Sequence, residues 1–246
     1  MRLTLALGEI MREWLKVLVW AAPIVVVLGC DPSPQRPVAD RSDNESSDSA
    51  NELPVNRSEV DESSRLPLWK PDESDLTELD GPYDFGDYEF RPPRAFKLLR
   101  SNHREMGMRM DIWMGKIRED ETYAQLLVMI SEPSIQNTKF SLKKTLRATV
   151  DQVRMRRSDW TEEEFEEGQV NGISFVRTSW SGVATDAARE GLAGRKMHGV
   201  VYLAIHNERV ISIMCQDVAP DHATSLEFGH LAAKTFAARP QSEMEH

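Results

Sequence analysis

The sequence predicts an α+β domain in which helices cover an antiparallel β-sheet, preceded by a signal peptide and a disordered linker. Three observations support this prediction. Short stretches of alternating apolar and polar residues recur from about residue 87 onward, as in half-buried strands. Two longer stretches have helical periodicity, and one of them separates two groups of strands. Before residue 66, a single apolar run is followed by a polar, acidic stretch.

The expected strands form two groups. The first group comprises 87–91, 95–99, 106–114 and 123–130, with the charged residues 118–121 as a hairpin tip. The second group comprises 165–170, 173–180, 196–206 and 209–216. Asn171-Gly172 and Asn207-Glu208 are the tight turns of this second group, and Asn-Gly is the strongest short-range hairpin signal. The second group is therefore predicted to be an antiparallel meander.

Two amphipathic stretches are predicted to be helices. Ser141 is suited to cap the first helix, which runs to about Arg156, and Pro220 suits the first turn of the second, which runs to about Ala237. The apolar faces carry Leu142, Leu146, Thr149, Val150 and Val153 in the first helix, and Leu226, Leu231, Ala232, Ala233 and Phe236 in the second. A basic stripe on the first helix, Lys143, Lys144, Arg147 and Arg154, is interpreted as a solvated face near the acids at 162–164.

The apolar run Val17–Leu28 is short for a membrane span, which needs about 20 residues, and fits the core of a signal peptide. The four residues after Val26, Val-Leu-Gly-Cys, resemble the bacterial lipobox, although Leu28 is bulkier than the residue usual at its position. In lipoproteins the cysteine is alkylated by diacylglycerol and the chain is cut before it. Residues 1–30 are therefore predicted to be a lipoprotein signal peptide with Cys30 as the lipidation site. An uncleaved signal anchor is the alternative.

Residues 31–80 are predicted to be an acidic, disordered linker, and residues 81–240 the folded domain. The stretch 31–65 carries nine acids and four bases and has almost no aliphatic or aromatic residues. It cannot bury enough apolar surface to offset chain entropy. Binding of a partner or calcium by these acids is the alternative interpretation. Residues 66–86 are transitional, and Trp69, Leu76 and Leu79 suggest a short docked segment there.

Charge and cysteine usage exclude several classes of function. The formal net charge of −10 argues against nucleic-acid binding, which requires a basic surface. The chain has two cysteines, so lipidation of Cys30 leaves Cys215 without a disulfide partner. Cys215 lies in an apolar run and is predicted to be a small buried side chain. A catalytic thiol is the alternative, but no neighbour in the sequence would lower its pKa.

No catalytic or metal-binding motif is present in the sequence, which therefore predicts no enzyme, no cofactor and no metal site. The histidines form no HExxH, HxH or Cys/His cluster: His198 and His206 share a strand, and His222 and His230 are two helical turns apart. The stretch 179–182, SWSG, lacks the leading glycine of a nucleophile elbow. The acids Glu162, Glu163, Glu164, Glu166 and Glu167 are expected to be exposed to solvent. The tryptophans Trp113, Trp160 and Trp180 are expected to pack in the core rather than to stack on a sugar or a partner.

Three stretches resemble the PsbP-like family. They are YEFRPPRAFKL at 88–98, SLKKTLRATVDQV at 141–153 with the following EGQVNGISFVRTSW, and VVYLAIHNERVISIMC at 200–215 with the terminal helix. The family includes the extrinsic lumenal subunit of photosystem II, a small Ran-binding nuclear-import factor and many bacterial lipoproteins. The resemblance spans about Gly86–Ala237. It implies an α/β/α sandwich with an accessory or binding role that is mostly non-enzymatic.

These expectations combine into one function. The chain is expected to be a membrane-tethered, extracytoplasmic, non-catalytic accessory module that binds an envelope protein and is held in the cell envelope by its lipid anchor. The alternative is a small-molecule or lipid-binding lipoprotein. For that alternative, Met106, Met108, Met110 and Met114 would form the adaptable lip of a pocket between helix and sheet.

Overall fold

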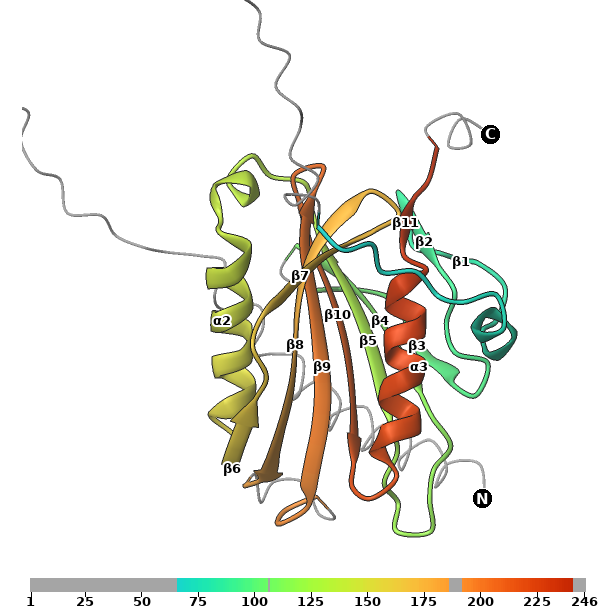
Figure 1. Cartoon of the computed structure of the whole chain (residues 1–246), viewed down its shortest axis with the longest axis vertical. Coiled ribbons are helices and arrows are strands. Elements are labelled where there is room, and N and C mark those ends of the chain that lie inside the picture. Colours follow the sequence, from blue (N-terminus) through green and yellow to red (C-terminus); the bar gives the residue numbers. More distant parts are fainter. Residues whose placement is uncertain (1–65, 106, 186–191, 241–246) are drawn as a thin grey trace, which may run out of the picture. The chain divides into compact units, whose positions relative to one another are not determined.

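The computed structural model describes residues 66–105, 107–185 and 192–240, and it shows one large antiparallel sheet with two helices packed on it (Figure 1). The strand order is β3-β4-β5-β10-β9-β8-β6, and β7 pairs with β8. The strands are β3 (Lys97–Glu105), β4 (Met108–Met114), β5 (Gln125–Ser131), β6 (Arg157–Glu162), β7 (Glu166–Val170), β8 (Ile173–Ala184), β9 (Lys196–His206) and β10 (Arg209–Val218). The predicted α+β class is confirmed.

The helices α2 (Leu142–Arg154) and α3 (His222–Lys234) lie on opposite faces of this sheet (Figure 1). Helix α3 rests on Cys215 of β10, since a Cβ added to Gly229 would lie 2.3 Å from the Cβ of Cys215. Helix α2 lies on the other face, where Arg157 donates to the carbonyl of Val153 and covers the ring of Trp180. Leu146, Thr149 and Val150 are the buried residues of α2.

The face under α3 holds the main aromatic core. A second, smaller sheet of β1 (Tyr83–Asp84), β2 (Tyr88–Phe90) and β11 (Ala237–Ala238) covers the part of this face that α3 leaves open. Tyr83 and Phe90 each pack edge-on against Trp113 with ring centroids 5.0 Å apart. Phe236, which follows α3, is fully buried beside them. Trp113 is thus a core residue, as predicted.

The packed chain begins before residue 81, so residues 66–80 belong to the fold and not to the linker. Leu68 forms a parallel bridge with Gln169 of β7. The ring of Trp69 then lies flat on Gly168, where any Cβ would come within 2.2 Å of it. The short 3-10 helix η4 (Asp75–Glu78) follows, and Leu79 is buried. The signal for this segment was its three apolar residues, which are too widely spaced to define a helix or a strand.

The predicted tight turns are confirmed by positive φ angles. Asn171 and Gly172 have φ of 47° and 82°, and Asn207 and Glu208 have φ of 47° and 61°. These values fit the turns that match the twist of paired strands. Strand β6 was not predicted, because Asp159, with φ of 47°, interrupts its pairing with β8 and breaks the alternation of its side chains.

Replacing Glu208 with glycine is expected to raise the free energy of unfolding by up to about 1 kcal/mol. Glycine adopts φ of 61° without the steric cost that a Cβ carries in this region. The carbonyl of residue 208 would still accept from Asn137 and Ser134. Urea unfolding of this variant and of Glu208→Ala checks the prediction. An equal gain in the alanine variant would show that the side chain, and not the φ angle, is the cause.

Helix α3 begins at His222, two residues later than predicted, and Asp221 is its N-cap residue. The carboxylate of Asp221 makes no capping hydrogen bond and instead lies 3.3 Å from Nε of Arg118. Ser141 likewise occupies the N-cap of α2 without a side-chain capping bond, and its carbonyl accepts from Thr145. In the described parts of the chain, no helix is long and apolar enough to span a membrane.

Replacing Gly229 with alanine is expected to lower the free energy of unfolding by about 1–3 kcal/mol, the cost of overpacking. Helix propensity alone would favour alanine by about 1 kcal/mol. Packing decides the sign here, because the added Cβ would lie 2.7 Å from Sγ of Cys215 and 2.3 Å from its Cβ. The measurement is thermal unfolding, with Gly81→Ala as the control, since nothing lies within 4 Å of a Cβ there. Restored stability in Gly229→Ala/Cys215→Gly would confirm the steric cause.

Candidate functional site

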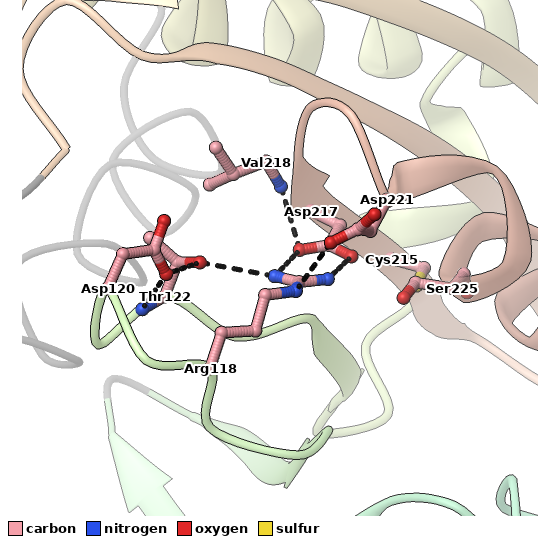
Figure 2. Close-up of polar contacts among 8 residues, drawn as sticks. All are labelled: Arg118, Asp120, Thr122, Cys215, Asp217, Val218, Asp221 and Ser225. Carbon is pink, nitrogen blue, oxygen red and sulfur yellow. Dashed lines mark hydrogen bonds and ion pairs between the residues drawn. The ribbon is translucent and has the colours of Figure 1, made fainter.

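A charged cluster closes one end of the sheet, where the β4–β5 loop meets the end of β10 and the start of α3 (Figure 2). The guanidinium of Arg118 donates to both carboxylate oxygens of Asp217, at 2.8 and 2.5 Å. Asp217 is completely buried, whereas Arg118 is about one-quarter exposed. Oδ1 of Asp217 also accepts the backbone N–H of Val218 at 2.7 Å.

Arg118 also contacts two further side chains. Nη1 lies 3.3 Å from Oγ1 of Thr122, and Nε lies 3.3 Å from Asp221. Thr122 in turn donates to Asp120 from its backbone N–H and its hydroxyl, and these hydrogen bonds lower the pKa of Asp120. An anionic ligand at Arg118 would have to displace Asp217. The cluster is therefore a structural clamp that joins the loop to β10 and α3.

The structure brings histidines together from different elements. The rings of His198, on β9, and His222, at the start of α3, are stacked with centroids 3.6 Å apart. Burial lowers the pKa of His198, and the positive charge that His222 can carry lowers it further. The sequence analysis considered only histidines on the same strand or the same helix. It therefore missed the contact between His198 and His222. Within the described ranges, no group of three or more His, Cys, Asp or Glu side chains is placed to hold a metal ion.

A second histidine lies in a hydrogen-bonded chain under α3. Nη1 of Arg177 donates to the hydroxyl of Tyr202 at 3.0 Å, and that oxygen lies 2.6 Å from Nδ1 of His230. Arginine only donates, so the single hydroxyl proton of Tyr202 is directed to Nδ1, which must be unprotonated. Burial lowers the pKa of His230 to about 4. Arg177 also pairs with Glu166 and covers the ring of Trp69.

The other residues singled out in the sequence lie in structural positions. Cys215 is buried, its thiol donates to the carbonyl of Ser225 at 3.3 Å, and burial raises its pKa, so it has no thiolate character. The stretch 179–182 lies inside β8, whereas a nucleophile elbow needs a strand-to-helix turn. Cys30 and Met106 lie outside the described residues.

The glutamates and the basic stripe pair with each other or with neighbouring side chains. Lys143 lies 2.5 Å from Glu167, and Arg147 forms an ion pair with Glu162. The hydrogen bonds from Arg147 and Trp160 lower the pKa of Glu162 against the opposing effect of burial. The stripe is thus a solvated face near acids, as predicted. Trp180 is buried and stacks on the half-buried Trp160, with ring centroids 5.3 Å apart, which is consistent with the predicted packing role.

The face of the sheet opposite α3 carries a group of apolar side chains on β4, β5 and β10, five of them methionines. On β4, Asp111 and Trp113 face Tyr83, so the alternate residues point to the opposite side. Pairing aligns Met110 with Met129, and Leu127 with Met214. We name this surface the methionine face. It consists of Met108, Met110, Ile112, Met114, Leu127, Met129 and Met214.

Among the described residues, the methionine face is an apolar surface on which neither α2 nor α3 packs. Helix α3 packs on the other side of the sheet, and α2 contacts β6, β8 and β9. Met106, Met108, Met110 and Met114 were expected to form an adaptable lip, and the alternation of β4 does place the last three on one face. Met129 and Met214 were missed, because the pairing of β5 with β10 joins residues 85 positions apart.

No family model and no curated protein matches this sequence. Solved structures with a similar arrangement include cyanobacterial PsbP (CyanoP) from Synechocystis sp. PCC 6803, at 15% identity and a TM-score of 0.47, covering 70% of this chain and 99% of that one. LpqN of Mycobacterium tuberculosis, described as involved in cell envelope biogenesis, matches at 10% identity and 0.48, covering 70% and 99%. A Mog1 mutant matches at 12% identity and 0.45, covering 67% and 98%.

Proposed function

We propose that this protein is a non-catalytic, extracytoplasmic module, tethered to a membrane through Cys30, that binds an envelope protein. The observation that supports the proposal is the methionine face. Methionine side chains are unbranched and adaptable, and they are common on surfaces that accommodate a partner. Six of its seven side chains are buried in the structure, and Met114 is partly exposed.

The polar clusters support a binding role over a catalytic one. Arg118 donates to Asp217 and Thr122 and pairs with Asp221, and the thiol of Cys215 is buried with a raised pKa. The hydroxyl of Tyr202 is shared between Arg177 and His230 beneath α3. Each of these groups is satisfied by neighbours in the fold, so none is directed at an incoming substrate. The tether keeps such a module near the membrane and the methionine face supplies the contact.

Site-specific photocrosslinking in cells tests the proposal. A photoreactive residue at Met114, a partly exposed position of the methionine face, is expected to capture one envelope protein repeatedly. The matched control is Met155, which is 69% exposed at the end of α2 and lies outside the face. The same adducts from both positions, or none from Met114, would contradict a partner-binding face.

The Cys30→Ser variant tests the tether in the same experiment. Without the acylated cysteine, the adduct at Met114 is expected to disappear from the membrane fraction. In the proposal the acyl groups on Cys30 hold the chain on the membrane, so their loss is expected to release it. If native mass spectrometry instead finds a small apolar molecule bound to the purified domain, the alternative of a lipid or small-molecule binder replaces this proposal.

A further inference from the structure

Two histidine side chains meet face to face where α3 begins on β9. The rings of His198 and His222 are stacked with centroids 3.6 Å apart and planes 9° apart. This contact suits two neutral rings, or one neutral and one protonated ring, because two positive charges at such a distance repel strongly. The pair therefore takes up its two protons in separate steps, and the second step opposes the contact.

The charged groups around His198 do not offset this repulsion. On β9 itself, Lys196 adds a positive charge two residues away. On β10, Asp217 is the register neighbour of His198, but Arg118 already donates to both of its carboxylate oxygens. On β8, the register neighbour is the uncharged Ser181. A second proton on the pair thus finds no free counter-charge on the three strands.

The start of α3 is equally unfavourable to a positive charge on His222. Asp221, the preceding residue, lies 3.3 Å from Nε of Arg118. On the β4–β5 loop, Asp120 pairs with Arg195. Nδ1 of His222 makes no hydrogen bond with the described residues. The N-terminus of a helix also bears a partial positive charge, which disfavours a cation there.

We propose that His198 and His222 form a pH-sensitive latch: when both rings are protonated they separate, and the first turn of α3 lifts from β9. The middle of the helix stays in place, because Gly229 lies so close to Cys215 that an added Cβ would be 2.3 Å from the Cβ of that residue. Burial, together with the charges of His222 and Lys196, lowers the pKa of His198. The latch is therefore closed at neutral pH and opens in mild acid.

Opening of the latch uncovers the thiol of Cys215. That thiol donates to the carbonyl of Ser225, in the first turn of α3, at 3.3 Å. Lifting this turn removes the acceptor and opens a path to the sulfur. The rate at which a reagent reaches Cys215 therefore reports how often the latch is open.

Labelling of Cys215 with 4,4′-dithiodipyridine tests the latch, because this disulfide reagent reacts with thiols in acid as well as at neutral pH. The full chain with Cys30→Ser is used, so that Cys215 is its single thiol. The labelling rate, divided by that of an unstructured cysteine peptide at the same pH, is expected to rise about tenfold or more from pH 7.5 to pH 5. A ratio that does not change with pH would overturn the inference.

Substitutions separate the latch from other titrating groups. The rise is expected to disappear in His198→Gln and in His222→Gln, since each leaves a single ring that can be charged. His222→Phe keeps an aromatic ring against His198 without a second charge, and slow labelling is expected at both pH values. The matched control is His230→Gln, which removes a histidine of the same helix whose pKa is also lowered and should retain the rise. Persistence of the rise in His222→Gln, or its loss in His230→Gln, would overturn the latch.

The urea dependence of labelling distinguishes opening of one turn from unfolding of the whole domain. A single turn exposes little surface, so the rate at pH 5 is expected to be nearly independent of urea at low concentrations. A rate that increases with urea as steeply as the unfolding equilibrium constant would show that the reagent reaches Cys215 through global unfolding. That result would also overturn the latch.

Discussion

Replacing Arg118 with alanine is expected to lower the free energy of unfolding by about 3–5 kcal/mol, because the carboxylate of Asp217 would remain buried without its counter-charge. Asp217 is 0% exposed and receives two hydrogen bonds from Arg118. After the replacement, the backbone N–H of Val218 is the remaining donor to that carboxylate among the contacts around it. Urea unfolding of the two proteins measures the difference.

Two variants separate this effect from general loss of a long side chain. Arg94→Ala removes an arginine whose ion pair with Asp80 is exposed on both sides, and it is expected to change stability far less. The double variant Arg118→Met/Asp217→Leu removes both charges and is expected to recover most of the loss, since well-packed apolar residues can replace a buried pair. Equal losses in Arg118→Ala and Arg94→Ala would show that Asp217 does not depend on Arg118.

The strands and hairpins could be predicted because their signals are local. Apolar stretches joined by a tight turn identified β9 and β10, and the Asn171-Gly172 and Asn207-Glu208 pairs marked turns whose φ angles are positive. Strand β6 could not be predicted in this way. Its sequence RSDWTE is polar, and the irregularity at Asp159 shifts its register against β8, so the two-residue period is lost.

The clusters of side chains could not be predicted, because they depend on how α3 lies on β9. Eight residues of helix cover about 12 Å, and four residues of strand cover about 13 Å. His222 and His230 therefore match His198 and Tyr202, and both contacts form together. Each element alone has an ordinary spacing. The contact between Arg118 and Asp217, which lie 99 residues apart in the sequence, likewise cannot be predicted without the fold.

Only part of the methionine face could be predicted from the sequence. Its β4 members could be identified by alternation, but the members from β5 and β10 require the pairing of distant strands. The register decides which of the two sets of residues on each strand faces α3. Cys215 faces Gly229, so its neighbour Met214 faces the other way. A shift of one residue in β10 would have exchanged these two side chains.

Acidification from pH 6.5 to pH 4 is expected to lower the free energy of unfolding by about 3 kcal/mol through His230 alone. Its pKa is about 4 in the folded protein, whereas an unfolded histidine has a pKa of about 6.5. Between these values the unfolded chain binds a proton that the folded chain does not, so stability rises with pH. The contribution is fully present above pH 6.5 and is lost as pH falls toward 4.

His230→Gln tests this mechanism because glutamine keeps an acceptor for the hydroxyl of Tyr202 but does not titrate. Protonated His230 would lose its acceptor at Nδ1 and face Arg177 and Lys234, with Glu166 as the opposing charge. His198, whose pKa is also lowered, titrates in both proteins and cancels in the difference. The difference in unfolding free energy between wild type and variant should therefore slope between pH 4 and 6.5 and be flat above. A flat difference throughout would show that the folded protein protonates His230 as readily as the unfolded chain does, and would contradict the prediction.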